Sequence, residues 1–159
     1  MSYVDSHPRQ GAFLGHLLQR LVDLINTQGD ELLAAAGLSL PSRAVSSLLL
    51  LGDQGQISAA DMAQQLNQPH QLVTQRVDKL MALGLVARFD DPSDGRRKIL
   101  GLTRKGKKEL RMLEGCLHDA ERRFQRLYEQ IECDLSAITI RAMKALSLNP
   151  VADRTATSK

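Results

Sequence analysis

Residues 57–103, with the sequence ISAADMAQQLNQPHQLVTQRVDKLMALGLVARFDDPSDGRRKILGLT, contain the pattern that decides the fold. Ser58 can cap a helix, in which apolar residues recur at helical spacing as far as Leu66. Pro69 suits the first turn of a second helix, and Gly84 suits its end. Two short helices joined by a tight turn are typical of proteins that place one helix in the major groove of DNA.

The second of these helices has one apolar and one polar side, because residues on a helix advance by about 100° each. The apolar positions are Val73, Val77, Leu80 and Met81, and the polar ones are Gln71, Thr74, Gln75 and Asp78. A glutamine amide can pair with N6 and N7 of adenine in the major groove. The alternative is an ordinary solvated helix face, so the interpretation depends on the segment that follows.

A hairpin with a basic tip follows the second helix. Residues 85–89 are apolar enough to form a strand, and residues 90–95 are a cluster of turn formers. Arg96-Arg97-Lys98 begins the returning strand, and Thr103 can cap the next helix. The three cations can reach phosphates, and one guanidinium can enter a minor groove. A surface loop with solvated charges is the alternative.

Together, these segments resemble the MarR family of winged helix-turn-helix repressors. The matching parts are the helix pair 57–83, the junction Leu83-Gly84-Leu85-Val86, the wing 91–97 and the exit Leu102-Thr103 followed by Gly106. The resemblance implies a mainly α (α+β) fold, with a winged helix-turn-helix, long N- and C-terminal dimerisation helices and a two-stranded β wing. It also implies that Arg96 enters the minor groove and that Asp94 braces the wing. The recognition helix begins Gln68-Pro69-His70-Gln71, where the family often has serine and arginine, which indicates a site preference of its own.

Ten residues are predicted to serve DNA binding. Gln71, Thr74 and Gln75 would read bases, His70 would contact a phosphate or a base, Arg76, Lys79, Arg97 and Lys98 would contact phosphates, and Asp94 and Arg96 would act in the wing. The charge distribution agrees with this, because ten of the 21 cations but only four of the 18 acids lie between Gln68 and Lys108. A chance cluster at a solvated helix start is the alternative.

Long amphipathic segments flank this region. Apolar residues repeat at helical spacing from Phe13 to Ile25 and again from Leu110 to Ile131, as in a coiled-coil seam, and a last helix is expected over 135–148. Their excess apolar surface predicts a homodimer, although packing within one chain is the alternative. The predicted organisation is a flexible N-terminus (1–9), an N-terminal dimerisation helix (10–36), the winged helix-turn-helix (39–103), C-terminal dimerisation helices (104–148) and a flexible tail (149–159), in one compact domain overall.

Several other classes of function lack support in the sequence. No hydrophobic run approaches a membrane span, and no export signal is apparent, so a cytoplasmic location is expected. The four histidines are scattered, and no catalytic or phosphate-loop motif occurs, which predicts no enzyme activity, no metal and no cofactor. Two cysteines, Cys116 and Cys133, do not suggest a disulfide framework.

The resulting hypothesis is a dimeric, sequence-specific transcriptional regulator, a repressor that binds double-stranded DNA at a pseudo-palindromic operator. The family resemblance adds release by a small aromatic or phenolic effector. Two alternatives remain: a winged-helix module that binds proteins, and a redox-responsive regulator that acts through Cys133 or Cys116.

Overall fold

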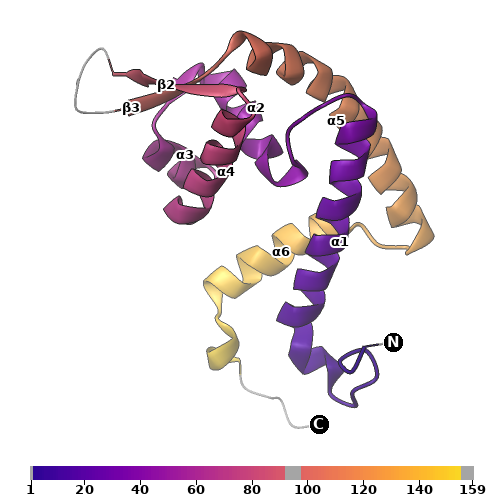
Figure 1. Ribbon diagram of the computed structural model, residues 1–159. Coiled ribbons are helices and arrows are strands. Elements are labelled where there is room, and N and C mark those ends of the chain that lie inside the picture. The colour runs from indigo at the N-terminus through magenta and orange to yellow at the C-terminus, as the bar shows by residue number, and fades with distance from the viewer. Residues whose placement is uncertain (1, 92–97, 155–159) are drawn as a thin grey trace. The chain divides into compact units, whose positions relative to one another are not determined.

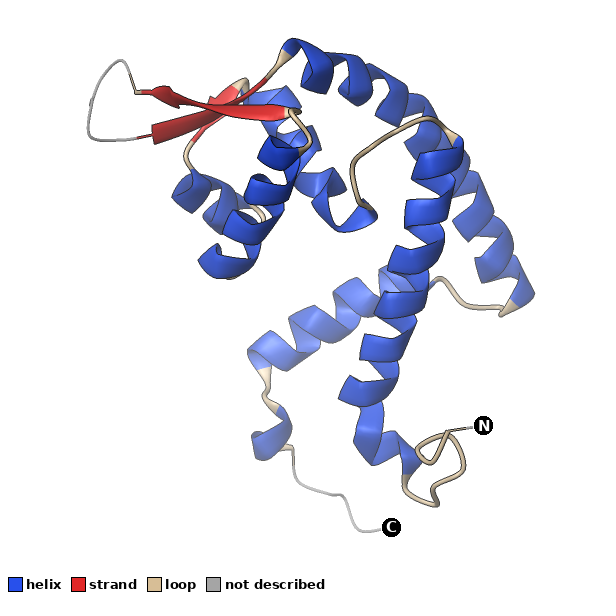
Figure 2. Ribbon diagram, viewed as in Figure 1, coloured by secondary structure: helices blue, strands red, loops and turns tan. Residues whose placement is uncertain are grey.

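The computed structural model describes residues 2–91 and 98–154. The helices and strands follow the order α1 (Leu14–Ala35), α2 (Val45–Gln54), β1 (Gln56–Ile57), α3 (Ala59–Gln65), α4 (His70–Ala82), β2 (Val86–Asp90), β3 (Lys98–Leu102), α5 (Arg104–Gln130) and α6 (Leu135–Leu148) (Figure 1). Three short 3-10 turns are η1 (Gln10–Phe13), η2 (Ser42–Ala44) and η3 (Val151–Asp153). Long helices and one small antiparallel sheet make up the fold (Figure 2), which confirms the predicted fold class.

The chain divides into two compact units, residues 1–116 and residues 117–159, with the boundary inside α5. The organisation into one compact domain overall stays a prediction, and burial of side chains changes at the boundary between these units. Cys116 is the last buried residue, and none of the described residues from 117 to 154 is buried. The first unit therefore has a hydrophobic core of its own, whereas the second exposes its apolar side chains.

The core of the first unit is built from α2, α3, α4, the strands and the start of α5. Its largest fully buried apolar side chains are Leu48, Leu51, Met62, Val73, Val77, Leu80, Leu85 and Leu113. The predicted helix signals are confirmed at their positions. The Ser58 hydroxyl accepts from the Asp61 amide at 3.1 Å, and the Thr103 hydroxyl accepts from the Gly106 amide at 3.0 Å. Gly84 has a φ of +71° just after α4, a conformation that favours glycine.

The sheet has three strands in the order β1-β3-β2, where the sequence predicts a two-stranded wing. β2 and β3 form the expected hairpin, with Val86 opposite Leu102 and Asp90 opposite Lys98. The additional strand, β1, pairs with β3 through only two residues. The start of α5 lies very close to the residue that precedes β2. A Cβ added at Gly106 would lie 2.0 Å from the Leu85 carbonyl oxygen. Only glycine fits that crossing.

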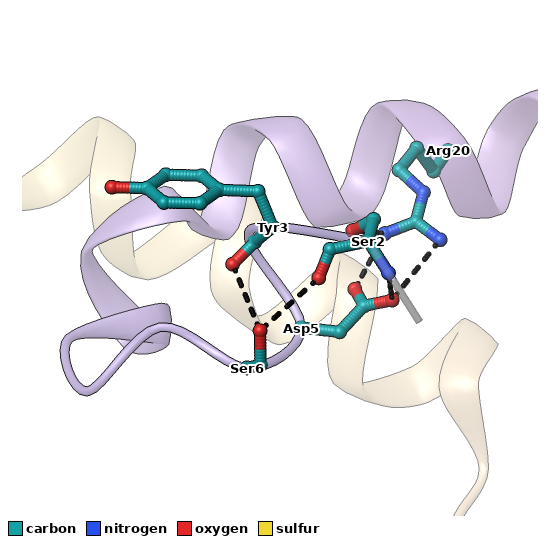
Figure 3. A network of polar contacts seen from close by, with 5 residues as sticks. All are labelled: Ser2, Tyr3, Asp5, Ser6 and Arg20. Atoms are coloured by element: carbon teal, nitrogen blue, oxygen red, sulfur yellow. Dashed lines mark hydrogen bonds and ion pairs between the residues drawn. The ribbon is translucent and has the colours of Figure 1, made fainter.

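The N-terminal residues fold back against α1. Arg20 donates to Asp5 Oδ1 at 2.5 Å and to Ser2 Oγ at 2.9 Å, while the Ser2 amide donates to Asp5 Oδ2 at 3.0 Å (Figure 3). The hydrogen bond from Arg20 is the main reason why the pKa of Asp5 falls from 3.8 to about 2. The flexibility expected of residues 1–9 stays a prediction, as does that of the tail. Within residues 2–91 and 98–154, no helix is both long and apolar enough to cross a membrane.

Candidate nucleic-acid interface

Helix α4 has the two sides that the sequence predicts. Val73, Val77 and Leu80 are buried against the core of the first unit, and His70, Gln71, Gln75 and Lys79 are exposed. Burial of the apolar side fixes the rotation of the helix about its axis. The exposed side is therefore held toward solvent by packing and does not depend on its own hydrogen bonds.

The turn between α3 and α4 is held by backbone hydrogen bonds. The Asn67 amide donates to the Gln64 carbonyl at 3.1 Å, and the Gln68 amide donates to the Ala63 carbonyl at 3.0 Å. Asn67 has a φ of +49°, in the left-handed region that asparagine tolerates better than most residues. Pro69 then precedes the first residue of α4. This tight turn fixes α4 relative to α3, as a helix-turn-helix requires.

The side chains predicted to read bases differ in how much hydrogen-bonding capacity they retain. Gln71 and Gln75 make no hydrogen bond with any residue in the described part of the chain. They lie one turn apart, which separates them by about 6 Å along the helix axis. The Thr74 hydroxyl instead donates to the His70 carbonyl at 2.9 Å. Thr74 can therefore only accept a hydrogen bond from a base, whereas both glutamines can donate and accept.

The predicted phosphate contacts also differ from one another. Lys79 is exposed and forms no ion pair with a described residue. Lys98 is exposed and pairs with Asp90 across the β2–β3 hairpin. Asp94, Arg96 and Arg97, which the sequence assigns to the wing, lie outside the described residues.

One contact between α4 and the hairpin is absent from the sequence analysis. Arg88 Nη2 of β2 donates to Asp78 Oδ1 of α4 at 3.0 Å. Both side chains are exposed, so the pair adds little to stability. It does join the polar side of α4 to the first strand of the wing, so the charge of Arg88 is partly neutralised beside the proposed interface.

Arg76 is placed differently from the other predicted contacts. Its side chain is half-buried, and its Nη1 donates to Gln68 Oε1 in the turn that precedes α4. Its Nε is buried and has no hydrogen-bond partner in the described part of the chain. Burial lowers the pKa of Arg76, and the charge of Arg43 lowers it further. The partial burial of Arg76 could have been predicted from helical spacing. Arg76 is three residues after Val73 and four before Leu80, which places it beside the apolar stripe.

Outside the polar side of α4, the described residues include two cysteines and border a hollow. No group of three histidine, cysteine or acidic residues there could hold a metal ion. Cys116 is buried and Cys133 is half-buried. A hollow of about 560 Å³ lies beside the helix-turn-helix and is lined by Ala60, Ala63, Gln64, Asn67, Gln68, Pro69 and His70.

Comparisons with known proteins agree with this geometry. Residues 36–97 match the model of the MarR family. The transcriptional regulator BldR from Sulfolobus solfataricus has a similar structure, with a TM-score of 0.60, 21% identity and alignment over 92% of this chain and 99% of that one. No curated protein gives a significant match.

Two further similar structures contain ligands. CouR from Rhodococcus jostii RHA1, bound to p-coumaroyl-CoA, has a TM-score of 0.59 and 21% identity over 99% of this chain and 100% of that one. A MepR mutant from S. aureus, bound to an oligodeoxyribonucleotide, has a TM-score of 0.51 and 22% identity over 84% of this chain and 96% of that one. At these identities, the likeness shows the fold.

Proposed function

We propose that this chain, whose residues 36–97 match the model of the MarR family, is a DNA-binding transcription regulator of that family and a homodimeric repressor of a pseudo-palindromic operator. The observation that carries the proposal is the exposed polar side of α4, where the side chains of Gln71 and Gln75 have no hydrogen-bond partner among the described residues. The Arg88–Asp78 contact joins this side of α4 to the β2–β3 hairpin. Proteins of this family regulate transcription and are not enzymes.

In the proposed complex, α4 lies in the major groove. Gln71 and Gln75 pair with base edges, with adenine as the best-matched base, and Thr74 accepts from a base amino group. His70 and Lys79, at the two ends of the same side, contact the backbone or a base, and Lys98 contacts a phosphate. Asp94 and Arg96 keep the wing roles that the family resemblance implies, and Arg97 contacts a phosphate.

The homodimer is supported by the apolar surface that one chain leaves uncovered. α6 has no buried residue and exposes Ile138, Ile140, Met143, Leu146 and Leu148, and α1 exposes Leu14, Leu18, Val22 and Leu24. Exposed apolar surface on this scale is typical of an interface between protein chains. A two-fold dimer would separate the two α4 helices by roughly 34 Å, one turn of DNA.

A small aromatic or phenolic effector would release the repressor by favouring a dimer arrangement with a different spacing of the two α4 helices. CouR, a protein of similar fold, is known bound to p-coumaroyl-CoA, which contains a phenolic ring. Binding to an operator also requires a cytoplasmic location, which is part of the proposal.

The direct test is to select genomic DNA fragments that bind the purified chain and then to measure affinity for the selected duplex at increasing salt. We expect a sequence preference and a steep loss of affinity with salt, because cations on the protein displace counterions from phosphates. Absent or salt-independent binding would contradict the proposal and would favour a protein-binding module. Addition of aromatic acids and their thioesters to the same assay tests effector release.

A further inference from the structure

The 3-10 turn η2 lies between α1 and α4 and contacts both helices within the first unit. Three polar contacts fasten η2 to α1. Arg43 Nη2 donates to Asp23 Oδ1 at 2.6 Å, the Ser42 amide donates to Asp30 Oδ1 at 2.6 Å, and the Ser42 hydroxyl donates to the Asn26 carbonyl at 3.0 Å. These contacts fix the position of η2 relative to α1.

Arg43 also acts on the recognition helix. Its positive charge is near enough to Arg76 of α4 to disfavour the charged form of that guanidinium. A guanidinium stays protonated in proteins. An increase in repulsion is therefore not relieved by loss of a proton from Arg76.

Arg76 combines one favourable polar contact with one unfavourable one. One hydrogen bond, to Gln68, holds the guanidinium against the helix-turn-helix, while its buried Nε lacks a partner among the described residues. A buried donor without a partner is unfavourable. The Asp23 carboxylate acts on a second unfavourable interaction, because its ion pair with Arg43 reduces the repulsion between Arg43 and Arg76.

We propose that Arg76 is a positioning residue for DNA recognition, which holds α4 against the turn through Gln68, and that the Asp23–Arg43 pair couples α1 to this contact. The inference rests on the proposed DNA-binding function and replaces the phosphate contact predicted for Arg76. α1 is also a proposed dimerisation helix, so this path would let the dimer arrangement influence the recognition helix without passing through the DNA.

The first experiment separates positioning from phosphate contact. Arg76→Met keeps much of the side-chain volume and removes the charge, and its matched control is Lys79→Met on the exposed side of α4. Fluorescence anisotropy would measure affinity for the selected operator and for a random duplex over a range of salt. Loss of a phosphate contact should lower the salt slope by about one.

For Arg76→Met, we expect about three- to tenfold weaker operator binding, an unchanged salt slope and little effect on the random duplex. Lys79→Met should instead lower the slope and weaken binding to both duplexes. A lowered slope for Arg76→Met would overturn the inference. If that variant does not fold, Gln68→Leu removes the same hydrogen bond from the other partner and should give the same pattern.

The second experiment is a double-mutant cycle between α1 and α4. Asp23→Asn removes the charge that neutralises Arg43, so we expect operator affinity to fall by about threefold, because residues in one polar network couple. The effect should disappear in the Arg76→Met background. Glu31→Gln is the matched control, since Glu31 is an exposed acid of α1 that pairs with no described residue, and it should have no effect.

Additive effects of Asp23→Asn and Arg76→Met would overturn the proposed coupling. Failure of the proposed function would give a different result, because the unmodified protein would then bind no selected duplex in a salt-dependent way. Thermal unfolding of each variant by circular dichroism completes the design. A loss of operator affinity that merely follows a loss of folded protein would also overturn the inference.

Discussion

The two units of this chain bury their apolar side chains to very different degrees. In the first unit, Leu48, Leu51 and Leu80 have 0% exposed surface. In the second, Ile140 of α6 is 62% exposed, and no described residue from 117 to 154 is buried. The first unit is thus stabilised by contacts among its own residues, whereas the second unit exposes apolar surface that is available to a partner. Stability and assembly should therefore respond to different substitutions.

The largest expected effect is the loss of the dimer. Ile138→Asp combined with Leu146→Asp places two charges on the exposed apolar side of α6, where a second copy is proposed to pack. Sedimentation velocity should show a monomer, and operator affinity should fall by about a hundredfold or more because linked binding of two half-sites is lost. Lys144→Glu, at an exposed position on the other side of the same helix, should change neither. A variant that remains dimeric would contradict the proposed role of α6.

The next prediction concerns the buried core of the first unit. Leu48→Ala leaves a cavity at a fully buried position of α2 and should lower the free energy of unfolding by about 2–5 kcal/mol. Leu72→Ala, at a partly exposed position of α4, is the control and should change it by about 0.5 kcal/mol or less. Urea unfolding would measure both. If the Leu48→Ala loss vanished in the monomeric α6 variant, the claim that this core is independent of the dimer would be wrong.

The next prediction concerns the free energy of unfolding and the close approach of α5 to Leu85. Gly106→Ala would place a methyl group 2.0 Å from a backbone oxygen of Leu85, which cannot move aside as a side chain would. We expect a loss of about 3 kcal/mol in the free energy of unfolding, the upper part of the range for overpacking. Gly115→Ala is the control, because a Cβ there meets no atom within 4 Å. Equal stability of the two variants would contradict the close approach.

Local signals in the sequence predict much of this structure. Ser58 and Thr103 cap helices where their hydroxyls precede helical runs, and Gly84 ends α4, because caps depend on residues only a few positions apart. The buried and exposed sides of α4 also follow from spacing alone. The same logic predicts the long flanking helices, although not where their apolar sides find partners.

Contacts between distant residues explain what the sequence leaves out. β1 consists of Gln56 and Ile57, and it is a strand only because β3 pairs with it from more than forty positions away. Glu109 follows several lysines and suggests a solvated acid, yet it is buried and accepts from both the amide and the hydroxyl of Ser39. Arg76 differs from these cases, because its partner Gln68 is only eight positions away and its place beside the apolar stripe of α4 already indicates partial burial.

Base recognition gives a prediction specific to the first unit. Gln75→Ala should weaken operator binding by about 1–3 kcal/mol and relax preference at one base pair, because its amide is proposed to pair with a base edge. Competition between operators that differ at single positions would identify that pair. Gln65→Ala, at the exposed end of α3, is the control. Equal losses on cognate and random DNA would refute base reading by Gln75.

The smallest expected effect concerns the N-terminal segment, which polar contacts tie to α1 in the first unit. The pKa of Asp5 is held at about 2, below its ordinary value of 3.8, mainly by the hydrogen bond from Arg20. The contact is therefore fully present above pH 4 and is lost as the pH falls toward 2, because protonation removes the acceptor charge. The carboxyl ¹³C shift of Asp5 should titrate with a midpoint near 2, and Arg20→Met should return it toward 3.8. A midpoint near 3.8 in the unmodified protein would mean that this segment is not anchored, whereas global unfolding should be unchanged by Arg20→Met because the pair is exposed.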